Sequence, residues 1–361
     1  MQNSPFRVRN GARTSALIAT GLALTLGLSA CGDDPAPAPA TVTVDPSVDA
    51  DKSAVPEPEV PLVWPLTGVA VEEAVNKPAI VVKVENTSAA RPQSGLEDAD
   101  VVWETIVEFE VSRFVAVYHS KTPKEVGPVR SARPVDLRIT KPMKPLFVFS
   151  GAQKRMVSRI ADSNVQAISH DAGAAGLSRS SARRAPHNVY ANLETILGNA
   201  DKSHQDSPEQ QFAFAPEAAE ATAVTAGADT KGISLNLSSA ARPAWAWDGK
   251  ADKWLRSEGS AKAMTAAGKQ LAATNVVVIE AEQADSGLKA QGGAMVPDTM
   301  IKGTGKALVA TGGKTFEATW SKETMGSPLK LVDANGQPVT LAPGNTWVEL
   351  MPKGKGSYTL S

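Results

Sequence analysis

The feature that most constrains the fold is a regular alternation of short apolar runs and turn signals in the second half of the chain. Glycine and asparagine turn residues recur there about every ten positions, which is the spacing expected of consecutive antiparallel strands. The turn signals are Gly303-Thr304-Gly305, Gly312-Gly313, Asn335-Gly336 and Pro343-Gly344-Asn345. The sequence therefore predicts an antiparallel, β-rich domain over residues 231–361, with about one helix, at residues 261–273.

The first half of the chain mixes strand and helix patterns. Runs rich in β-branched and aromatic residues predict strands at residues 79–84, 100–109, 112–120 and 146–149. Helices are expected to begin at Pro134 and to cover residues 153–161 and 192–197. We therefore expect a layered α/β sandwich with a mixed sheet over residues 62–215, joined to the second half by a connection at residues 216–230. The fold class predicted for the whole chain is α+β.

Residues 1–30 have the pattern of a lipoprotein signal peptide. Three arginines precede an apolar stretch at residues 16–28, which is shorter than the ~20 residues that a membrane-spanning helix needs. Small residues then lead to Cys31 in the order Leu28-Ser29-Ala30-Cys31, which matches a bacterial lipobox. We expect Cys31 to receive lipid and to become the new N-terminus; the alternative is an ordinary secretory signal with a chance cysteine.

Cys31 is the only cysteine of the chain. This excludes an internal disulfide, and lipidation of Cys31 leaves no thiol for a cysteine nucleophile or a zinc cluster. Residues 31–61 are rich in proline, alanine and acidic residues, and therefore predict a disordered spacer between the lipid and the folded part. The expected location is the extracytoplasmic face of the cell membrane, with the lipid bilayer as the first partner.

The charge balance of the whole chain is close to neutral, with 37 basic and 38 acidic residues. Its distribution is uneven, because residues 62–112 carry nine acids and three bases whereas residues 113–184 carry four acids and fourteen bases. An acidic segment beside a basic segment can neutralise one another within one domain, and an extracytoplasmic address argues against nucleic acid. No nucleic-acid partner is expected.

A cluster of arginines is the strongest candidate for a site. Arg130 and Arg133 follow a Gly-Pro turn, and two similar segments are Arg91-Pro92-Gln93-Ser94-Gly95 and Ala185-Pro186-His187-Asn188. The planar guanidinium group suits a carboxylate or a phosphate. The candidate ligand-binding residues are Arg91, Arg113, Arg130, Ser131, Arg133, His187 and Asn188, with Glu85, Glu104 and Glu108 as acidic complements.

These residues support several functions, which stay open at this level. The first is a non-catalytic module that binds an anionic small molecule or wall component, and the second is a buried Arg–Glu network in a scaffold that binds an envelope protein. A third is an envelope hydrolase with Ser131 as nucleophile and His187 as base, oriented by an acid such as Glu104. The four histidines lack the spacing of metal ligands, and no cofactor is expected.

The order of the motifs also carries a resemblance. In the first half, the matching landmarks are Pro65-Leu66-Thr67-Gly68, Glu85-Asn86, Arg91-Pro92-Gln93-Ser94-Gly95-Leu96, Arg113-Phe114, the arginine segment at residues 127–133 and Ala185-Pro186-His187-Asn188. In the second half, they are Trp247-Asp248, Arg256, Asn275-Val276, Gly303-Thr304-Gly305 and Trp320. Together they resemble the YerB-like bacterial lipoproteins, a family catalogued as a domain of unknown function with N- and C-terminal halves. The resemblance implies a layered α/β first half and a β-rich second half, and it implies no reaction.

The chain departs from this family pattern at two places. The family usually shows a glycine pair where this chain has Phe109-Glu110-Val111-Ser112. It also often carries a histidine in the segment before Asn275, where this chain has Met264 and Thr265. A chemical step that relied on that histidine would be missing here.

Overall fold

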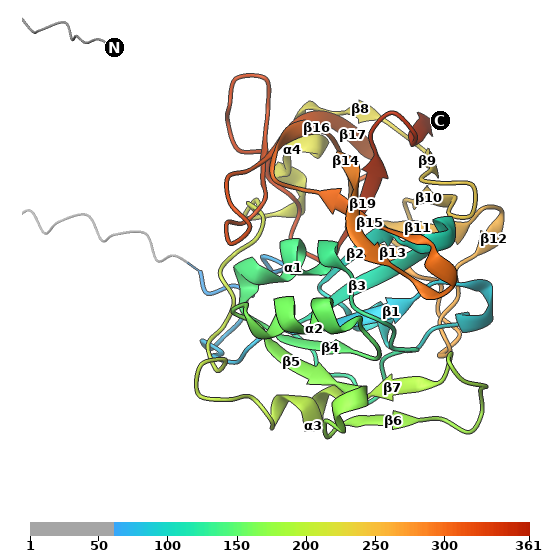
Figure 1. Ribbon diagram of the computed structural model, residues 1–361. Coiled ribbons are helices and arrows are strands. Elements are labelled where there is room, and N and C mark those ends of the chain that lie inside the picture. The colour runs from blue at the N-terminus through green and yellow to red at the C-terminus, as the bar shows by residue number, and fades with distance from the viewer. Residues whose placement is uncertain (1–60) are drawn as a thin grey trace, which may run out of the picture. The chain divides into compact units, whose positions relative to one another are not determined.

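The computed structural model describes residues 61–361 (Figure 1). The predicted signal peptide, Cys31 and nearly all of the spacer lie outside these residues. None of the helices between residues 61 and 361 is long and apolar enough to cross a bilayer. The predicted α+β fold class is confirmed by one large mixed sheet, a smaller antiparallel sheet and a few short helices.

The large sheet has twelve strands and contains residues from both halves of the chain. Its main path, in spatial order, is β18 (Lys330–Val332), β17 (Lys314–Lys322), β16 (Gly303–Thr311), β14 (Asn275–Lys289), β19 (Thr346–Pro352), β2 (Val101–Ile106), β3 (Ser112–Tyr118), β1 (Ile80–Glu85), β4 (Leu146–Phe149) and β5 (Gln166–Ser169). Outside this path, β15 (Met295–Met300) pairs with β14, and β8 (Ala228–Asp229) pairs with β17. The two halves meet where β19 runs parallel to β2. The division of the chain at residues 216–230 stays a prediction.

A second, antiparallel sheet of six strands lies beside the large one (Figure 1). Its strands are β12 (Ala261–Lys262), β11 (Lys253–Glu258), β10 (Pro243–Asp248), β9 (Gly232–Asn236) and β20 (Ser357–Leu360), with β13 (Ala272–Ala273) paired to β11. A hairpin of β6 (Leu177–Arg179) and β7 (Val189–Ala191) completes the strands of the described chain.

The helices are short. The α-helices are α1 (Pro134–Thr140), α2 (Lys154–Ala161), α3 (Leu193–Leu197) and α4 (Thr222–Ala226). Single-turn 3₁₀ segments are η1 (Ser88–Ala90), η2 (Leu96–Asp98), η3 (Glu108–Glu110), η4 (Lys141–Met143), η5 (His170–Ala172), η6 (Ala218–Glu220) and η7 (Gln291–Gly293). Phe109 in η3 and Gly292 in η7 have positive φ, so these two segments are irregular turns. The three helices expected in the first half are therefore confirmed, and so are the strands expected there, although β2 ends at Ile106, earlier than expected.

Alternation along the strands of the large sheet separates two cores. On one face, Val115 and Phe147 belong to the same apolar cluster as Ile160 of α2. On the other face, Phe114 belongs to a cluster with Trp245 of the second sheet. Both faces are covered, which explains why β1 and β3 are buried along their whole length rather than at every second residue.

The helix predicted at residues 261–273 is wrong. This segment forms the short strands β12 and β13 with a loop between them. Gly268 in that loop has a φ of +75°, which ends any helix, and the amide of Ala263 donates to the carbonyl of Arg256. Leu271 is buried and its amide donates to Ala263. Pairing with the second sheet therefore overrides the helix propensity of the alanine-rich sequence.

Candidate functional site

One cavity gathers most of the residues that the sequence singled out. It has a volume of about 510 Å³ and lies where the carboxyl end of β1 meets the starts of α1 and α2. The lining residues are Glu85, Thr87, Glu108, Phe109, Val111, Arg113, Arg130, Ser131, Arg133, Ala152, Gln153, Pro186, His187, Lys289 and Ala290. We call this the arginine cavity. Its last two residues come from the hairpin of β14 and β15, so both halves of the chain contribute to it.

The segment that carries Arg130 and Arg133 is fixed by backbone hydrogen bonds on both sides. The amide of Arg130 donates to the carbonyl of Lys83 in β1 at 2.7 Å, and the amide of Val129 donates to the carbonyl of Val189 in β7 at 2.7 Å. Farther on, Asp136 accepts from the amide of Arg133 and caps the start of α1. These bonds hold the backbone of the segment in place, so its side chains project from a fixed position.

Glu108 binds two arginines in the wall of the cavity. Its Oε2 accepts from Arg133 Nε at 2.7 Å, and its Oε1 accepts from Arg133 Nη2 and lies 3.4 Å from Arg113 Nη2. Burial disfavours the charged carboxylate, but the hydrogen bond from Arg133 and the two positive charges outweigh it and lower the pKa of Glu108 to about 2. Burial also lowers the pKa of Arg113 to about 10, and the nearby charge of Arg133 acts in the same direction. Arg113 and Arg133 are thus largely occupied by structural pairs.

Arg130 is the guanidinium with the most free hydrogen-bonding capacity in the cavity. Within residues 61–361, its side chain makes one hydrogen bond, from Nη1 to the carbonyl of Pro186 at 3.3 Å. Its Nε lies 3.4 Å from Glu85 Oε2 without forming a hydrogen bond. Glu85 is instead held by Thr87 Oγ1 and by His187 Nδ1, each at 2.8 Å. Because a guanidinium group has five N–H donors, most of those of Arg130 are available to a ligand.

The residues that line the arginine cavity carry more positive than negative charges. Four cationic side chains, including Lys289, face two carboxylates across the cavity. The hydroxyl of Ser131 has no hydrogen-bond partner among the described residues, and a Cβ on Gly151 would lie 2.7 Å from that oxygen. Glycine at position 151, with a φ of +87°, therefore leaves room for the hydroxyl. Ala152 and Gln153 also bring the start of α2 to the cavity, where helical N–H groups favour an anion.

Three of the candidate residues lie elsewhere. Arg91 lines a separate cavity, donates to Asn86 and pairs with Glu258 at 3.0 Å. Asn188 donates to the carbonyl of Ser180 and accepts from Arg179, so it holds the loop between β6 and β7. The third, Glu104, is completely buried between the two sheets.

The partner of Glu104 is Arg256, which the site prediction did not include. Arg256 Nη2 contacts Glu104 at 2.8 Å and Glu258 at 2.9 Å, and its Nη1 contacts Glu349 at 2.7 Å. Its guanidinium also lies over the rings of Phe114, Trp245 and Trp347. The sequence signal was available, because period-two alternation in β11 places Arg256 on the same buried face as Trp254.

Glu104 and Glu349 respond differently to this burial. Burial and the negative charge of Glu104 raise the pKa of Glu349 well above its ordinary value. Burial opposes ionisation of Glu104 too, but the charge of Arg256 outweighs it and lowers the pKa of that carboxyl. The protonated form of Glu349 is therefore favoured to a higher pH than for an exposed glutamate. We refer to Arg256, Glu104, Glu258 and Glu349 as the buried arginine cluster.

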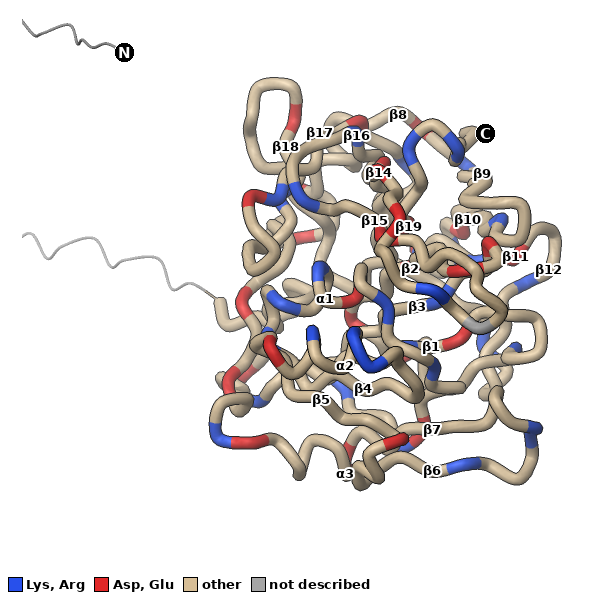
Figure 2. The backbone as a smooth tube through the Cα atoms, in the orientation of Figure 1, with Lys and Arg blue, Asp and Glu red and all other residues tan. Residues whose placement is uncertain are grey.

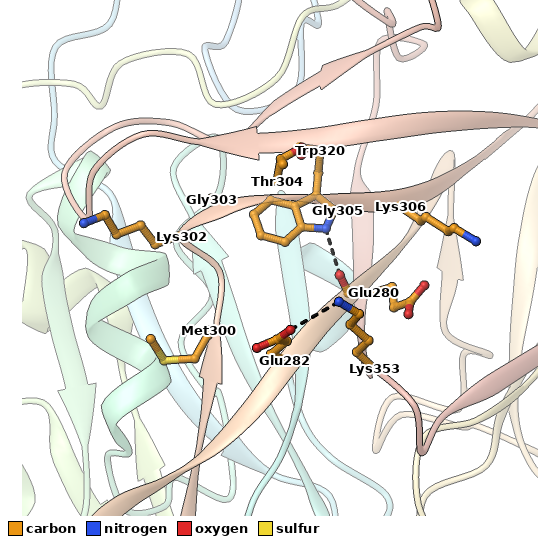
Figure 3. Close-up of a pocket in the computed structure, with 10 residues that line it drawn as sticks. All are labelled: Glu280, Glu282, Met300, Lys302, Gly303, Thr304, Gly305, Lys306, Trp320 and Lys353. Atoms are coloured by element: carbon orange, nitrogen blue, oxygen red, sulfur yellow. Dashed lines mark hydrogen bonds and ion pairs between the residues drawn. The ribbon is translucent and has the colours of Figure 1, made fainter.

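A second charged cavity, of about 410 Å³, lies on the large sheet (Figure 3). Lys302, Lys306 and Lys353 surround it, and Lys353 pairs with Glu282 at 3.2 Å. Trp320 lies in its wall with the indole N–H on the carbonyl of Glu280, but it is 3% exposed and offers no face for stacking. Charged residues of both signs are interspersed along the whole described chain (Figure 2). In the arginine cavity, Arg130 keeps donors that have no partner among residues 61–361.

The comparisons with known proteins agree with this architecture. The chain matches the models described as "Protein of unknown function (DUF3048) N-terminal domain" over residues 66–206 and "DUF3048 C-terminal domain" over residues 233–348. The chain belongs to this family. It is 30% identical over 313 residues to "Putative lipoprotein YerB" of Bacillus subtilis, covering 83% of this chain and 89% of that protein. The crystal structure of YerB protein from Bacillus subtilis matches with a TM-score of 0.70 and 25% identity, covering 82% of this chain and 99% of that one. The predicted resemblance is confirmed.

Proposed function

We propose that this protein is a non-catalytic, membrane-anchored lipoprotein that binds an anionic ligand in the arginine cavity. The observation that carries the proposal is Arg130, a partly exposed guanidinium whose donors are mostly free at the wall of a cavity with excess positive charge. A phosphate or carboxylate would satisfy these donors. An anionic small molecule, a wall component and an acidic side chain of an envelope protein all share that chemistry.

The anchoring part of the proposal rests on the sequence. Cys31 follows a lipobox and would carry the lipid, which places the folded part on the extracytoplasmic face of the cell membrane. The relative named as a lipoprotein supports this assignment. Mass spectrometry of the protein extracted from its native membrane should find diacylglycerol on Cys31, and a free N-terminus before or after that position would contradict it.

A thermal unfolding experiment tests the ligand part. Inorganic phosphate added to the full chain in detergent, at constant ionic strength, should raise the melting temperature, because a ligand that binds only the folded state stabilises it. Arg130→Ala should abolish this increase. Arg242→Ala removes an exposed arginine immediately before β10 and should keep the increase. No increase in the unmodified protein with either phosphate or acetate would overturn the proposal.

Glu85 and His187 favour a second candidate, an envelope hydrolase. A carboxylate on His187 Nδ1 is the arrangement that orients a histidine base, and Ser131 lines the same cavity. Glu85 would then hold the position that the sequence analysis gave to Glu104. The structure has no hydrogen bond between Ser131 and His187 within residues 61–361, so the binding role is preferred. A fluorophosphonate probe should leave Ser131 unlabelled, and labelling that requires His187 would favour the hydrolase.

A further inference from the structure

Phe109 at the edge of the arginine cavity is the most exposed of the large apolar side chains between residues 61 and 361. It is 66% exposed, and the next, Leu62, is 49% exposed. An isolated exposed apolar residue is ordinary, but this one also lines a cavity rich in cationic groups. The exposure of Phe109 beside this cavity therefore suggests that its ring contacts a ligand.

The backbone of Phe109 adds a second observation. Phe109 has a φ of +62°, a left-handed conformation that is unfavourable for a residue with a Cβ and that glycine adopts freely. Because the side chain of Phe109 is mostly exposed, packing contacts offset little of the free-energy cost of this backbone conformation. Strained conformations of this kind cluster at functional sites, where the surrounding structure holds them in place.

The surrounding structure does hold this turn. On one side, Glu108 is bound by Arg133, and on the other, Glu110 accepts from the hydroxyl and the amide of Ser239. The amide of Val107 donates to the carbonyl of Val111 across the turn at 2.9 Å. Phe109 is thus presented at the cavity on a fixed loop, with its ring mostly uncovered.

The composition of the cavity narrows what the ring could contact. A phosphate on Arg130 would occupy a small part of the 510 Å³, which is within the usual size of sites for whole organic ligands. The rest of the lining mixes apolar groups with polar ones, among them Thr87, Ser131 and Gln153. An acyl chain would leave these polar groups unpaired, whereas a sugar ring offers C–H groups to an aromatic face and hydroxyls to polar side chains.

We propose that Phe109 determines specificity by stacking on a sugar ring, and that the ligand of the arginine cavity is a glycosyl phosphate. The inference rests on the proposed function, since the phosphate of that ligand binds Arg130. A free sugar phosphate and a glycosyl phosphate unit within a polymer share this chemistry. The cavity is expected to recognise a single glycosyl phosphate in either form.

Isothermal titration of the full chain in detergent with four probes tests the inference. The probes are inorganic phosphate, glycerol 3-phosphate, glucose 1-phosphate and phenyl phosphate. Glucose 1-phosphate should bind about tenfold more tightly than inorganic phosphate or glycerol 3-phosphate, a difference typical of one aromatic contact. Phe109→Ala should remove this preference and leave the affinity for inorganic phosphate unchanged, whereas Phe109→Trp should retain it. Leu360→Ala, which shortens another exposed apolar side chain, should behave as the unmodified protein.

The possible failures point to different parts of the argument. If no probe binds and acetate does not raise the melting temperature either, the proposed function itself is wrong; if only acetate acts, the glycosyl phosphate is wrong. Two outcomes would contradict the role of Phe109 even if inorganic phosphate binds in an Arg130-dependent way. In the first, the unmodified protein shows no preference for glucose 1-phosphate. In the second, Phe109→Ala keeps that preference. Tighter binding of phenyl phosphate than of glucose 1-phosphate would overturn the sugar as the ligand class. A purified wall polymer that binds where glucose 1-phosphate does, and more tightly, would identify the polymer as the source.

Discussion

The arginine cavity and the buried arginine cluster contain the same residue types in opposite settings. Arg256 is completely buried and contacts three carboxylates, whereas the side chain of Arg130 is 21% exposed and makes one hydrogen bond to the described chain. Because a buried charge that water cannot reach must be paired, Arg256 binds carboxylates from both sheets and holds the sheets together. Arg130 has one carboxylate partner, Glu85 at 3.4 Å, and most of its donors are free, which is why we connect it with a ligand.

The protonation states sharpen the contrast. In the cavity, Glu108 faces two cations and its pKa falls to about 2. In the buried cluster, Arg256 contacts three carboxylates, of which only Glu258 has a second cation, Arg91, and the pKa of Glu349 rises well above its ordinary value. Ionisation of the same type of side chain is therefore favoured in one region and opposed in the other. The number of cations per carboxylate decides which state is stable.

The largest expected effect follows from removing the buried cation. Arg256→Met should lower the free energy of unfolding by about 3–5 kcal/mol, because Glu104 loses its counter-charge inside the protein and Glu258 keeps only Arg91. Urea unfolding of the full chain in detergent measures this change. Arg242→Ala should change the free energy by less than about 0.5 kcal/mol. A loss below about 1 kcal/mol for Arg256→Met would contradict the structural role.

A smaller loss is expected for Glu108→Gln. The substitution leaves Arg113 and Arg133 without their carboxylate and should cost about 2 kcal/mol at pH 7, the size of a hydrogen bond to a charged group. Because the pKa of Glu108 is lowered to about 2 from 4.5, its contribution is present above pH 4.5 and is lost as the pH falls toward 2. The difference from the unmodified protein should therefore shrink between pH 4.5 and 2.

Urea unfolding across that pH range checks this expectation. Glu323→Gln removes an exposed carboxylate that is 78% accessible and serves as the control, with little change at any pH. A constant difference between Glu108→Gln and the unmodified protein from pH 7 to pH 3 would show that Glu108 is not ionised in the way described.

Glu349→Gln should show the opposite pH dependence. A carboxyl with a raised pKa stabilises the folded state fully below pH 4.5, and this contribution is lost as the pH rises toward its folded-state pKa. Glutamine resembles the protonated carboxyl and lacks this loss. The free energy of unfolding of Glu349→Gln should therefore increase relative to the unmodified protein as the pH rises from 5 to 8, whereas Glu282→Gln, at an exposed site, should show no such trend. A trend of the opposite sign would place the proton elsewhere in the cluster.

Local sequence patterns predicted most elements of the first half, but they did not predict contacts between segments distant in sequence. The strands β1, β2 and β3 follow from local apolar patterns, and so do α1 and α2. The segment before Asn275 was not predictable in this way, because its conformation depends on pairing with β11 and with Gln93, which is distant in sequence. Local propensity carries no information on such partners.

For the site, the sequence named the arginines and three acidic complements, but it did not show which pairs form or that Glu104 lies away from the cavity. Alternation in β2 places Glu104 on the face shared with Val102 and Ile106, and that face is covered by the second sheet. Only the strand order shows that Arg256 lies there, while Glu85 is the residue that reaches His187. The spacing of residues along a strand determines which side chains share a face of the sheet. The residues that those side chains contact depend on how strands distant in sequence pack together.

The smallest stability change, and the most direct test of the comparison, is expected for Arg130→Ala. Removal of the guanidinium breaks the 3.4 Å ion pair with Glu85, but that carboxylate keeps its two shorter contacts with Thr87 and His187. The free energy of unfolding should fall by about 1 kcal/mol or less in urea, several-fold below the loss for Arg256→Met. An equal loss for the two variants would mean that Arg130 is as structural as Arg256, because its donors would then be matched within the fold and would not be available to an anion.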